Sequence, residues 1–439
     1  MKKHQRESRR RSRNEVSRRE FLKTSAAMSA AALVSGLGTS HIYAAGSDTI
    51  KVGLIGCGGR GNGAIRDFLK AAKQSNAAAK VVAFGDLWGD RAKGSMNNLK
   101  EDQNLGAMVD ATEEACFGGF DNYEKVLGSG IDAIVTAAPP GFRPHHVPAA
   151  IAAGKHVFME KPVCVDPWGY REMIKAAEMA TQKKLTVVAG TQRRHSNRYR
   201  ATLEEIRNGR MGKVVGGQFY WMGGPVTHNR PRGPNMSDIE WQILNWYAWC
   251  WTCGDHIVEQ HVHNLDIMLW ALGSPPEKCV AVGGRQTRQE PGNIWDHFAV
   301  EYEFPGGVRC ASYCSHWRGG AGRVSERVVG EKGTSNCNGG ISGETNWNYE
   351  GQDPNAYVQE HVDFLASIKG DGPHYNETKQ VTESCMAAVM GRMAAYTGRE
   401  LSWKWATESS KLRLGPENWN AFGPFQPPPV PVPGKTELI

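Results

Sequence analysis

The sequence has no apolar run long enough to cross a bilayer with ease. The best candidate, residues 26–37, is rich in alanine, serine and glycine. It is shorter than the roughly 20 apolar residues that a spanning helix needs. An excess of charge of one sign is also lacking outside residues 1–44. Those residues carry ten lysines and arginines against three acids and so account for the whole formal net charge of +7. A near-neutral body gives no electrostatic reason to expect a nucleic-acid partner.

Cysteine has no regular spacing. The ten cysteines are scattered, and Cys250 and Cys253 form a lone CxxC with no second pair to complete a zinc finger. We therefore expect buried thiols in place of a disulfide framework, with redox use of this pair as the alternative. No internal repeat is present either.

The basic leader has the order of regions that an export signal requires. Residues 17–23 (SRREFLK) resemble the twin-arginine motif, an apolar run follows, and residues 42–44 offer a small-residue cleavage site. We expect residues 1–44 to be a twin-arginine signal peptide and the mature protein to be periplasmic or otherwise exported, without a membrane span. An uncleaved anchor and a basic tail are the alternatives.

Strand and helix patterns alternate over residues 48–190 and favour a parallel α/β sheet of Rossmann type. Extended segments joined by short turns follow, which favours an α+β domain over residues 191–410 with a large, open, mostly antiparallel sheet. One face of such a sheet can meet another subunit, so we expect a homodimer or homotetramer. Residues 411–439 are proline-rich and should form an extended arm.

A glycine-rich turn lies between the expected strand at 49–55 and the expected helix at 64–79. Residues 56–61 (GCGGRG) fit GxGxxG in the context that makes this motif credible. The glycines permit a tight turn, a close approach of the backbone to a pyrophosphate and close packing of the helix on the strand. The expected dinucleotide contacts are Gly56, Cys57, Gly58, Gly59, Arg60 and Gly61.

Asp86 ends the second expected strand. A carboxylate there accepts hydrogen bonds from the adenosine ribose and repels a 2′-phosphate, so the sequence favours NAD over NADP. Arg91, five residues later, can weaken that preference.

Two further segments complete a family pattern. They are residues 154–162 (GKHVFMEKP) and 254–266 (GDHIVEQHVHNLD). With the GxGxxG turn they resemble the Gfo/Idh/MocA family, the group of glucose-fructose oxidoreductase and inositol dehydrogenase, over residues 49–405. The resemblance implies a nucleotide-binding domain followed by an α/β domain with a large open sheet.

The resemblance also implies a catalytic site. Glu160 and Lys161 would contact the cofactor, and Lys161 would lie beside the nicotinamide and the substrate hydroxyl. The acid of the family and the histidine four residues later correspond to Glu259 and His263, and here glutamate replaces the more usual aspartate. A histidine can take a hydroxyl proton near neutral pH as hydride leaves carbon. On one helix, residues 259 and 263 would share a face.

Other polar residues are expected to face the same cleft. Pro139 and His146 follow a strand and would border the nicotinamide, with structural support as an equal alternative for His146. Gln192 and Arg193 follow the strand at 187–189 and are expected to bind substrate hydroxyls, with a surface ion pair as the alternative. His256 is a further substrate-binding candidate.

The residues around Glu259 also include the types that bind metals. His256, Glu259 and His263 would form one stripe on a helix, with His261 close by. A polar active-site helix explains the same pattern, and the family's reaction needs no metal, so we expect none. A preceding cluster can stack on sugar rings or fill the core, and comprises Trp241, Trp246, Tyr247, Trp249 and Trp251.

These patterns predict an NAD-dependent oxidoreductase acting on a sugar or polyol hydroxyl. Because free NAD is scarce outside the cytoplasm, we expect the cofactor to be tightly bound. A redox-neutral NAD-using glycosidase that acts through a keto-sugar is the alternative. A non-catalytic sugar or nucleotide sensor is disfavoured because Lys161, Glu259 and His263 are intact.

Overall fold

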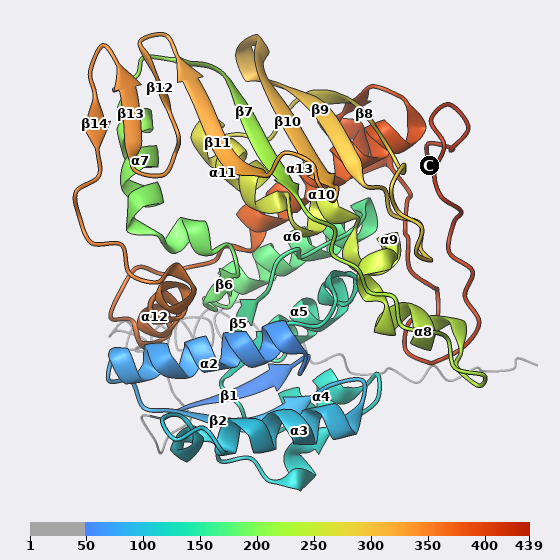
Figure 1. Cartoon of the computed structure of the whole chain (residues 1–439). Coiled ribbons are helices and arrows are strands. Elements are labelled where there is room, and N and C mark those ends of the chain that lie inside the picture. Colours follow the sequence, from blue (N-terminus) through green and yellow to red (C-terminus); the bar gives the residue numbers. More distant parts are fainter. Residues whose placement is uncertain (1–48) are drawn as a thin grey trace, which may run out of the picture. The chain divides into compact units, whose positions relative to one another are not determined.

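Two β-sheets organise residues 49–439, the part of the chain that the computed structural model describes (Figure 1). The expected signal peptide, residues 1–44, lies outside the described residues. Among residues 49–439, no helix is both long and apolar enough to span a membrane.

The first sheet has six parallel strands in the order β3-β2-β1-β4-β5-β6. Its strands are β1 (Ile50–Ile55), β2 (Ala79–Gly85), β3 (Cys116–Phe117), β4 (Ala133–Thr136), β5 (His156–Met159) and β6 (Val187–Ala189). The connecting helices are α2 (Gly59–Gln74), α3 (Gly89–Lys100), α4 (Asn122–Leu127), α5 (Arg143–Ala152) and α6 (Pro167–Gln182). The strand order reverses between β1 and β4, and ligands of open α/β sheets bind at the carboxyl ends of strands at such a point.

Helix α2 begins five residues earlier than the sequence predicts, at Gly59 and not at residue 64. Glycine has a low helix propensity, so the turn residues looked unsuited to a helix. Packing decides otherwise, because a Cβ at Gly61 would lie 1.8 Å from the main-chain oxygen of Gly56. The first turn of the helix therefore needs glycine to lie against the end of β1.

The second sheet has nine strands in the order β14-β13-β12-β11-β7-β10-β9-β8-β15. They are β7 (Val214–Gly223), β8 (Lys278–Gly284), β9 (His297–Phe304), β10 (Val308–His316), β11 (Arg323–Gly330), β12 (Gly333–Ser335), β13 (Gly340–Gly343), β14 (Trp347–Asn348) and β15 (Leu401–Ser402). β7 and β10 pair in parallel, and the other pairs are antiparallel. The predicted combination of a Rossmann-type sheet with a large, mostly antiparallel sheet is confirmed.

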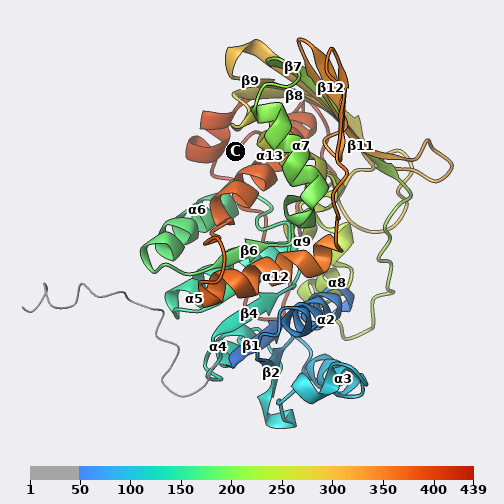
Figure 2. The same ribbon diagram turned by 90° about the vertical axis from the view of Figure 1, so that its left-hand side faces the viewer.

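Helices cover one face of the second sheet. α11 (Val262–Leu272) contacts β7 and β11, while α13 (Thr378–Thr397) contacts β8 and β9. Seventeen of the 20 residues of α13 are buried, as expected for a helix that is enclosed on every side. α12 (Ala356–Lys369) packs on α2, so the chain returns to the first sheet after completing the second (Figure 2).

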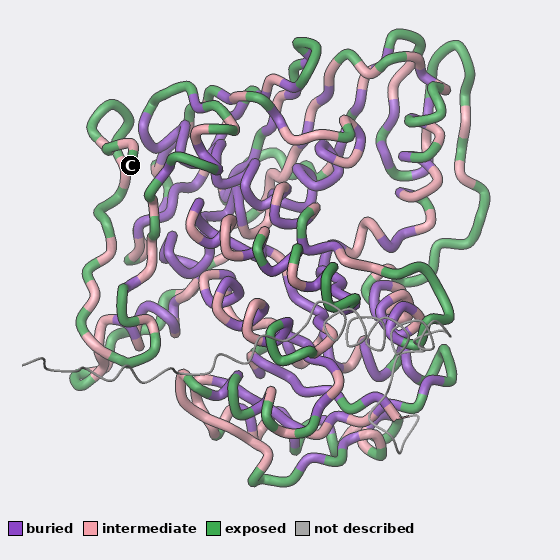
Figure 3. The backbone as a smooth tube through the Cα atoms, turned by 180° about the vertical axis from the view of Figure 1, so that it is seen from behind, coloured by how far each residue is buried: buried purple, intermediate pink, exposed green. Residues whose placement is uncertain are grey.

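The remaining helices are α7 (Asn197–Arg207), α8 (Asp238–Leu244), α9 (Cys250–Cys253) and α10 (His256–Glu259). After the short helix Trp405–Ser409 the described chain has no further helix or strand. Residues 410–439 form this tail, and most of them are exposed or half-buried (Figure 3). It is held by side chains of the body, since the Asn293 amide donates to the Pro428 oxygen at 2.9 Å.

Candidate active site

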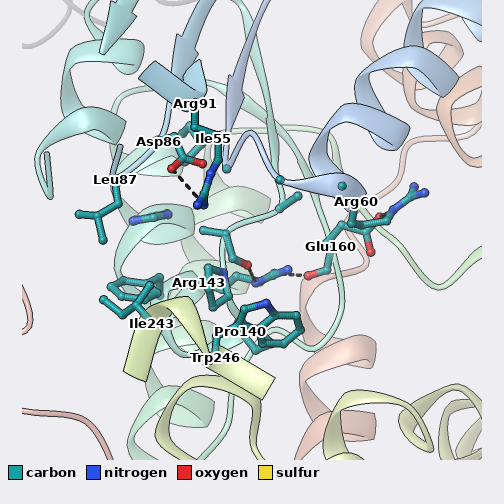
Figure 4. Close-up of a pocket in the computed structure, with 18 of the residues that line it drawn as sticks. Ile55, Arg60, Asp86, Leu87, Arg91, Pro140, Arg143, Glu160, Ile243 and Trp246 are labelled. Atoms are coloured by element: carbon teal, nitrogen blue, oxygen red, sulfur yellow. Dashed lines mark hydrogen bonds and ion pairs between the residues drawn. The ribbon is translucent and has the colours of Figure 1, made fainter. Parts of the chain in front are cut away.

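A pocket of 490 Å³ opens at the carboxyl ends of the parallel strands (Figure 4). Its lining includes residues that directly follow β1, β2, β4 and β5, namely Gly56, Asp86, Ala137 and Glu160. Because parallel strands present these ends at one edge, residues far apart in the sequence meet in the pocket.

The glycine-rich turn has the space and the donors for an anionic group. Gly56 has φ +90°, and a Cβ there would lie 2.5 Å from the Ala138 nitrogen. Gly58 and Gly59 line the pocket, and a Cβ on either would meet nothing within 4 Å. Gly58 caps α2 without a side-chain hydrogen bond, so the N–H groups of the first turn are free of any side-chain cap. An open helix N-terminus in a pocket fits the pyrophosphate of a dinucleotide.

Asp86 is buried beside this turn. Its Oδ2 accepts from the Cys57 N–H at 2.8 Å, and its Oδ1 accepts from the Trp88 N–H at 3.1 Å. The Arg91 guanidinium lies 3.5 Å from Oδ1, and Figure 4 shows the two side chains facing each other. Burial raises the pKa of Asp86, although the Trp88 N–H and Arg91 oppose the shift. This part of the pocket thus holds a carboxylate with an arginine next to it.

Lys161 and Glu259 also line this pocket and contact each other. The Lys161 Nζ donates to the Glu259 main-chain oxygen at 2.7 Å and lies 3.1 Å from its Oε1. Both side chains are mostly buried, with exposed fractions of 14% and 13%. The structure thus brings together two of the three residues predicted to be catalytic.

Glu160 contacts two arginines that line the same pocket. Its Oε1 lies 2.5 Å from the Arg60 Nε, and its main-chain oxygen accepts from the Arg143 guanidinium, as Figure 4 shows. Burial lowers the pKa of Arg143 to about 10, with Glu160 limiting the fall, so Arg143 stays charged near neutral pH. Sequence reasoning missed Arg143, because no motif marks a charged residue that binds the main chain of another segment.

A second pocket, of 290 Å³, shares Lys161, Glu160 and Arg60 with the first. His263 lines this second pocket, and Glu259 lines the first. Lys161 therefore lies between the two, within reach of groups in both.

The break between Glu259 and His263 corrects the expectation that one helix carries both. α10 ends at Glu259, and α11 begins at Val262. His261 is buried with its Nε2 2.7 Å from the Ser312 Oγ, and Gln260 Oε1 lies 2.6 Å from the His316 Nε2. These anchors on β10 hold the turn, so the four-residue spacing does not place both side chains in one pocket.

His263 is held as a neutral imidazole. Its ring stacks on Trp221 with centroids 5.8 Å apart, and the residue is 7% exposed. Burial lowers the pKa of His263 well below its usual value, and the positive charges of Lys161 and Arg193 act in the same direction. A neutral imidazole can accept a proton near pH 7.

The predicted substrate-binding residues lie in different surroundings. Gln192 lines the second pocket, and its amide donates to the Tyr357 hydroxyl at 3.1 Å. Arg193 lines neither pocket and forms an ion pair with buried Glu326. The expected alternative was an ion pair at the surface, whereas this ion pair lies in the interior. His256 is fully buried and also lines neither pocket.

His256 is part of an interior network and not of a metal stripe. Its Nδ1 lies 3.0 Å from the Asp255 Oδ1, and its ring stacks on His316 with centroids 4.4 Å apart. Among residues 49–439, no group of three or more His, Cys, Asp or Glu side chains is placed to hold a metal ion. The helix break explains this arrangement, because it turns Glu259, His261 and His263 in different directions.

Pro139 and His146, the residues expected to border the nicotinamide, both line the first pocket. His146 stacks on Tyr123 with centroids 4.6 Å apart, and burial lowers the pKa of His146 to about 3. Its Nδ1 has no hydrogen-bond partner within the described part of the chain. A neutral ring with an unpartnered polar atom is consistent both with a contact to a ligand and with structural support of the pocket wall.

Of the five clustered aromatic residues, Trp246 lines the first pocket. Trp251 is buried and donates from its indole to Gln242 at 2.7 Å, which is a packing role. His228 and Ile243 also line the pocket, although no sequence pattern marked them.

Models of known families match most of the chain. Residues 50–190 match the oxidoreductase family with an NAD-binding Rossmann fold, and residues 199–336 match the GFO/IDH/MocA C-terminal domain. Residues 15–35 match the signal sequence of the twin-arginine translocation pathway.

Relatives with the same fold are known. The chain is 25% identical over 261 residues to the inositol 2-dehydrogenase of Burkholderia cenocepacia, which covers 60% of this chain and spans 66% of the length of that relative. The scyllo-inositol dehydrogenase of Lactobacillus casei superposes with a TM-score of 0.60 at 19% identity, covering 81% of this chain and 98% of that one. The WlbA dehydrogenase of Bordetella pertussis, in complex with NADH and UDP-GlcNAcA, superposes with a TM-score of 0.60 at 17% identity. That match covers 81% of this chain and 98% of the WlbA chain.

Proposed function

Because the chain belongs to the GFO/IDH/MocA oxidoreductase family, we propose that it transfers hydride between NAD and a hydroxyl group of a sugar or polyol. The observation that carries the proposal is the position of Lys161, between the pocket of the glycine-rich turn and the pocket that His263 lines. A hydroxyl held at Lys161 has a proton acceptor on one side and the dinucleotide on the other.

The dinucleotide would occupy the first pocket, with its pyrophosphate at Gly58 and Gly59 and its adenosine ribose at Asp86. Its nicotinamide supplies a two-electron hydride acceptor when bound. Asp86 supports NAD over NADP because a buried carboxylate disfavours a 2′-phosphate. Arg91 reduces this preference without reversing it, since it already lies against Asp86.

The protein's own residues would then handle the proton. Lys161 donates a hydrogen bond to the substrate oxygen and orients it. Glu259 holds the Lys161 ammonium in place, because its main-chain oxygen accepts from Nζ at 2.7 Å and its carboxylate lies 3.1 Å away. Neutral His263 takes the hydroxyl proton or returns it when the reaction runs backwards.

We place the mature enzyme in the periplasm or elsewhere outside the cytoplasm, on the basis of the twin-arginine match at residues 15–35. Export favours a cofactor that is not released, and this supports a second candidate function. In that function, hydride taken from a glycoside is returned to the same molecule after the glycosidic bond is cleaved.

We further propose that residues 191–410 form the substrate and oligomerisation domain of a homodimer or homotetramer. The second sheet supports this, because it exposes large apolar side chains that a partner subunit can cover. They are Val215, Val280, Val282, Tyr313 and Val324.

The test is the nucleotide content of protein purified from the exported fraction. One portion is desalted and denatured, and the released NAD(H) and NADP(H) are assayed per chain. A second, native portion is supplied with polyols, sugars and glycosides. Reduction of added NAD by a polyol or sugar supports the oxidoreductase. Retained NAD with cleaved glycoside and no net reduction supports the second function. A chain that binds neither nucleotide contradicts both.

A further inference from the structure

We propose that the C-terminal tail retains the dinucleotide by bracing the walls of the first pocket from behind. The bracing residues are Trp419 and Phe422, which act as positioning residues. The inference rests on the proposed function in one respect, which is that the ligand of this pocket is a dinucleotide.

Phe422 supports the ribose end. Its ring centroid lies 6.5 Å from that of Trp88 and 5.1 Å from that of Phe120, and both of those residues line the pocket. Trp88 packs against a second group as well, since the Arg91 guanidinium lies 4.4 Å from the Trp88 ring centroid. Because Arg91 in turn contacts Asp86, a chain of side-chain contacts joins the tail to the residue expected to bind the ribose.

Trp419 supports the wall that His146 forms. It stacks on His145 with centroids 3.8 Å apart and lies 6.4 Å from His146. It also lies 6.1 Å from Phe142, which lines the same pocket. Two groups of residues that line the first pocket are therefore contacted by rings three positions apart in one segment of the tail.

The segment that carries these rings is tied down at both ends. The Leu414 N–H donates to the Asp166 Oδ2 at 2.8 Å, just before α6. The Phe425 N–H donates to the Asp238 Oδ2 at 3.0 Å, and the Phe425 oxygen accepts from the Gln242 amide at 2.8 Å, both on α8. A segment fixed beside α6 and to α8 cannot move outward with the pocket wall without breaking one of these hydrogen bonds.

Retention follows because a dinucleotide leaves when its walls move apart. Aromatic contacts and anchored ends favour the closed walls, so their loss raises the rate of dissociation more than it changes the rate of association. This is the property that an exported enzyme needs if free nucleotide is scarce around it.

The experiment measures the release of radiolabelled NAD from the full mature chain. The protein is loaded, excess unlabelled NAD is added, and bound label is followed by rapid desalting. The variants are Trp419→Leu and Phe422→Ala. The control carries Val430→Ala and Val432→Ala, which remove exposed apolar side chains from the same tail away from the pocket walls.

We expect release to become faster by about tenfold or more in Trp419→Leu and by a smaller factor in Phe422→Ala, with the control equal to the parent. Phe422 is 45% exposed, so its replacement leaves the core intact and decides the test if Trp419→Leu does not fold. Equal release from the parent and from both tail variants would overturn the inference while leaving the proposed function in place. A parent that takes up no nucleotide overturns both.

Discussion

Lys161 depends on a single residue, Glu259, for both of its acceptors, a main-chain oxygen and a carboxylate. The main-chain contact and the carboxylate contact together fix the position of the ammonium group. A substrate hydroxyl that enters the site can therefore meet a lysine that is already oriented.

Replacing Lys161 with alanine should lower kcat by about 10²–10⁴-fold, because the substrate oxygen loses its hydrogen-bond donor. Bound nucleotide should remain, since the glycine-rich turn and Asp86 are untouched. Steady-state rates and nucleotide content per chain measure the two effects. Lys175→Ala, at an exposed site, is the matched control. Full activity in the Lys161 variant would end the assignment.

His263 determines the expected pH dependence. Because burial and nearby cations lower its pKa, the imidazole stays neutral and able to accept a proton well below its usual titration range. In the direction of alcohol oxidation, kcat/KM should stay level as the pH falls to about 6.5 and decline only at lower pH. A pH–rate profile checks this. A decline centred at or above 6.5 would show that another group takes the proton.

Asp86 is expected to select the cofactor. Asp86→Ala removes the acceptor for the ribose hydroxyls and exposes Arg91 to a 2′-phosphate, so affinity should shift from NAD towards NADP. Titration of each nucleotide against the parent and the variant gives the ratio of dissociation constants. An unchanged ratio would mean that another group reads the ribose.

The short helix η4 (Gln192–His195) is tied to two later helices through His195. Its Nδ1 lies 2.7 Å from Asp363 on α12, and its Nε2 lies 3.4 Å from Glu377, which precedes α13. Burial alone would lower the pKa of His195, but Glu377 and Asp363 raise it to about 8. The charged imidazole therefore stabilises the packing of these elements.

The sign of this effect can be tested with His195→Gln. Because the pKa of His195 is higher in the folded than in the unfolded state, its protonation stabilises the folded state. This stabilisation is complete below the unfolded pKa of about 6.5 and is lost as the pH rises through about 8. The difference in unfolding free energy between parent and variant should fall by about 2 kcal/mol from pH 6 to pH 9. Denaturant unfolding at several pH values measures it. A constant difference would contradict a charged His195.

Arg194 and Asp266 link the segment after the first sheet to the helix beneath the second. The Arg194 Nε lies 2.8 Å from one oxygen of Asp266, and its Nη2 lies 2.9 Å from the other. The Asp266 side chain is 2% exposed, and it also accepts from the Ser384 hydroxyl at 2.8 Å. The pair therefore joins η4 to α11 and α13 in the interior of the molecule.

Arg194→Leu should lower the free energy of unfolding by about 3–5 kcal/mol, because it leaves a buried carboxylate without its cation. The double variant Arg194→Leu with Asp266→Leu should recover part of this loss. Arg309→Ala, which breaks exposed pairs with Glu301 and Glu303, should cost no more than about 1 kcal/mol. If Arg194→Leu lowers the free energy of unfolding by as little as Arg309→Ala does, the ion pair between Arg194 and Asp266 does not stabilise the folded chain.

Much of the fold was predictable because it depends on local patterns. Buried strands, glycine-rich turns and helix periodicity involve neighbours within a few residues, and the strand expected at 49–55 is present as β1, Ile50–Ile55. The start of α2 was not predictable from propensity, since a contact with the end of β1 decides it.

The pocket was predictable only in part. Glycine-rich turn residues, Asp86 and Lys161 follow strand ends, and parallel strands bring such ends together whatever lies between them. His228 and Tyr357 line the two pockets from segments with no motif, so only the folded chain places them there.

The sequence by itself determined the family, the parallel order of the first sheet and the residue types at its edge. Tertiary structure alone decided that Glu259 and His263 face different pockets, because anchors on β10 break the helix between them. It also decided that Trp419 and Phe422 lie behind the pocket walls. A proline-rich tail has no internal pattern that specifies its course, and its path is set by the surface on which it packs.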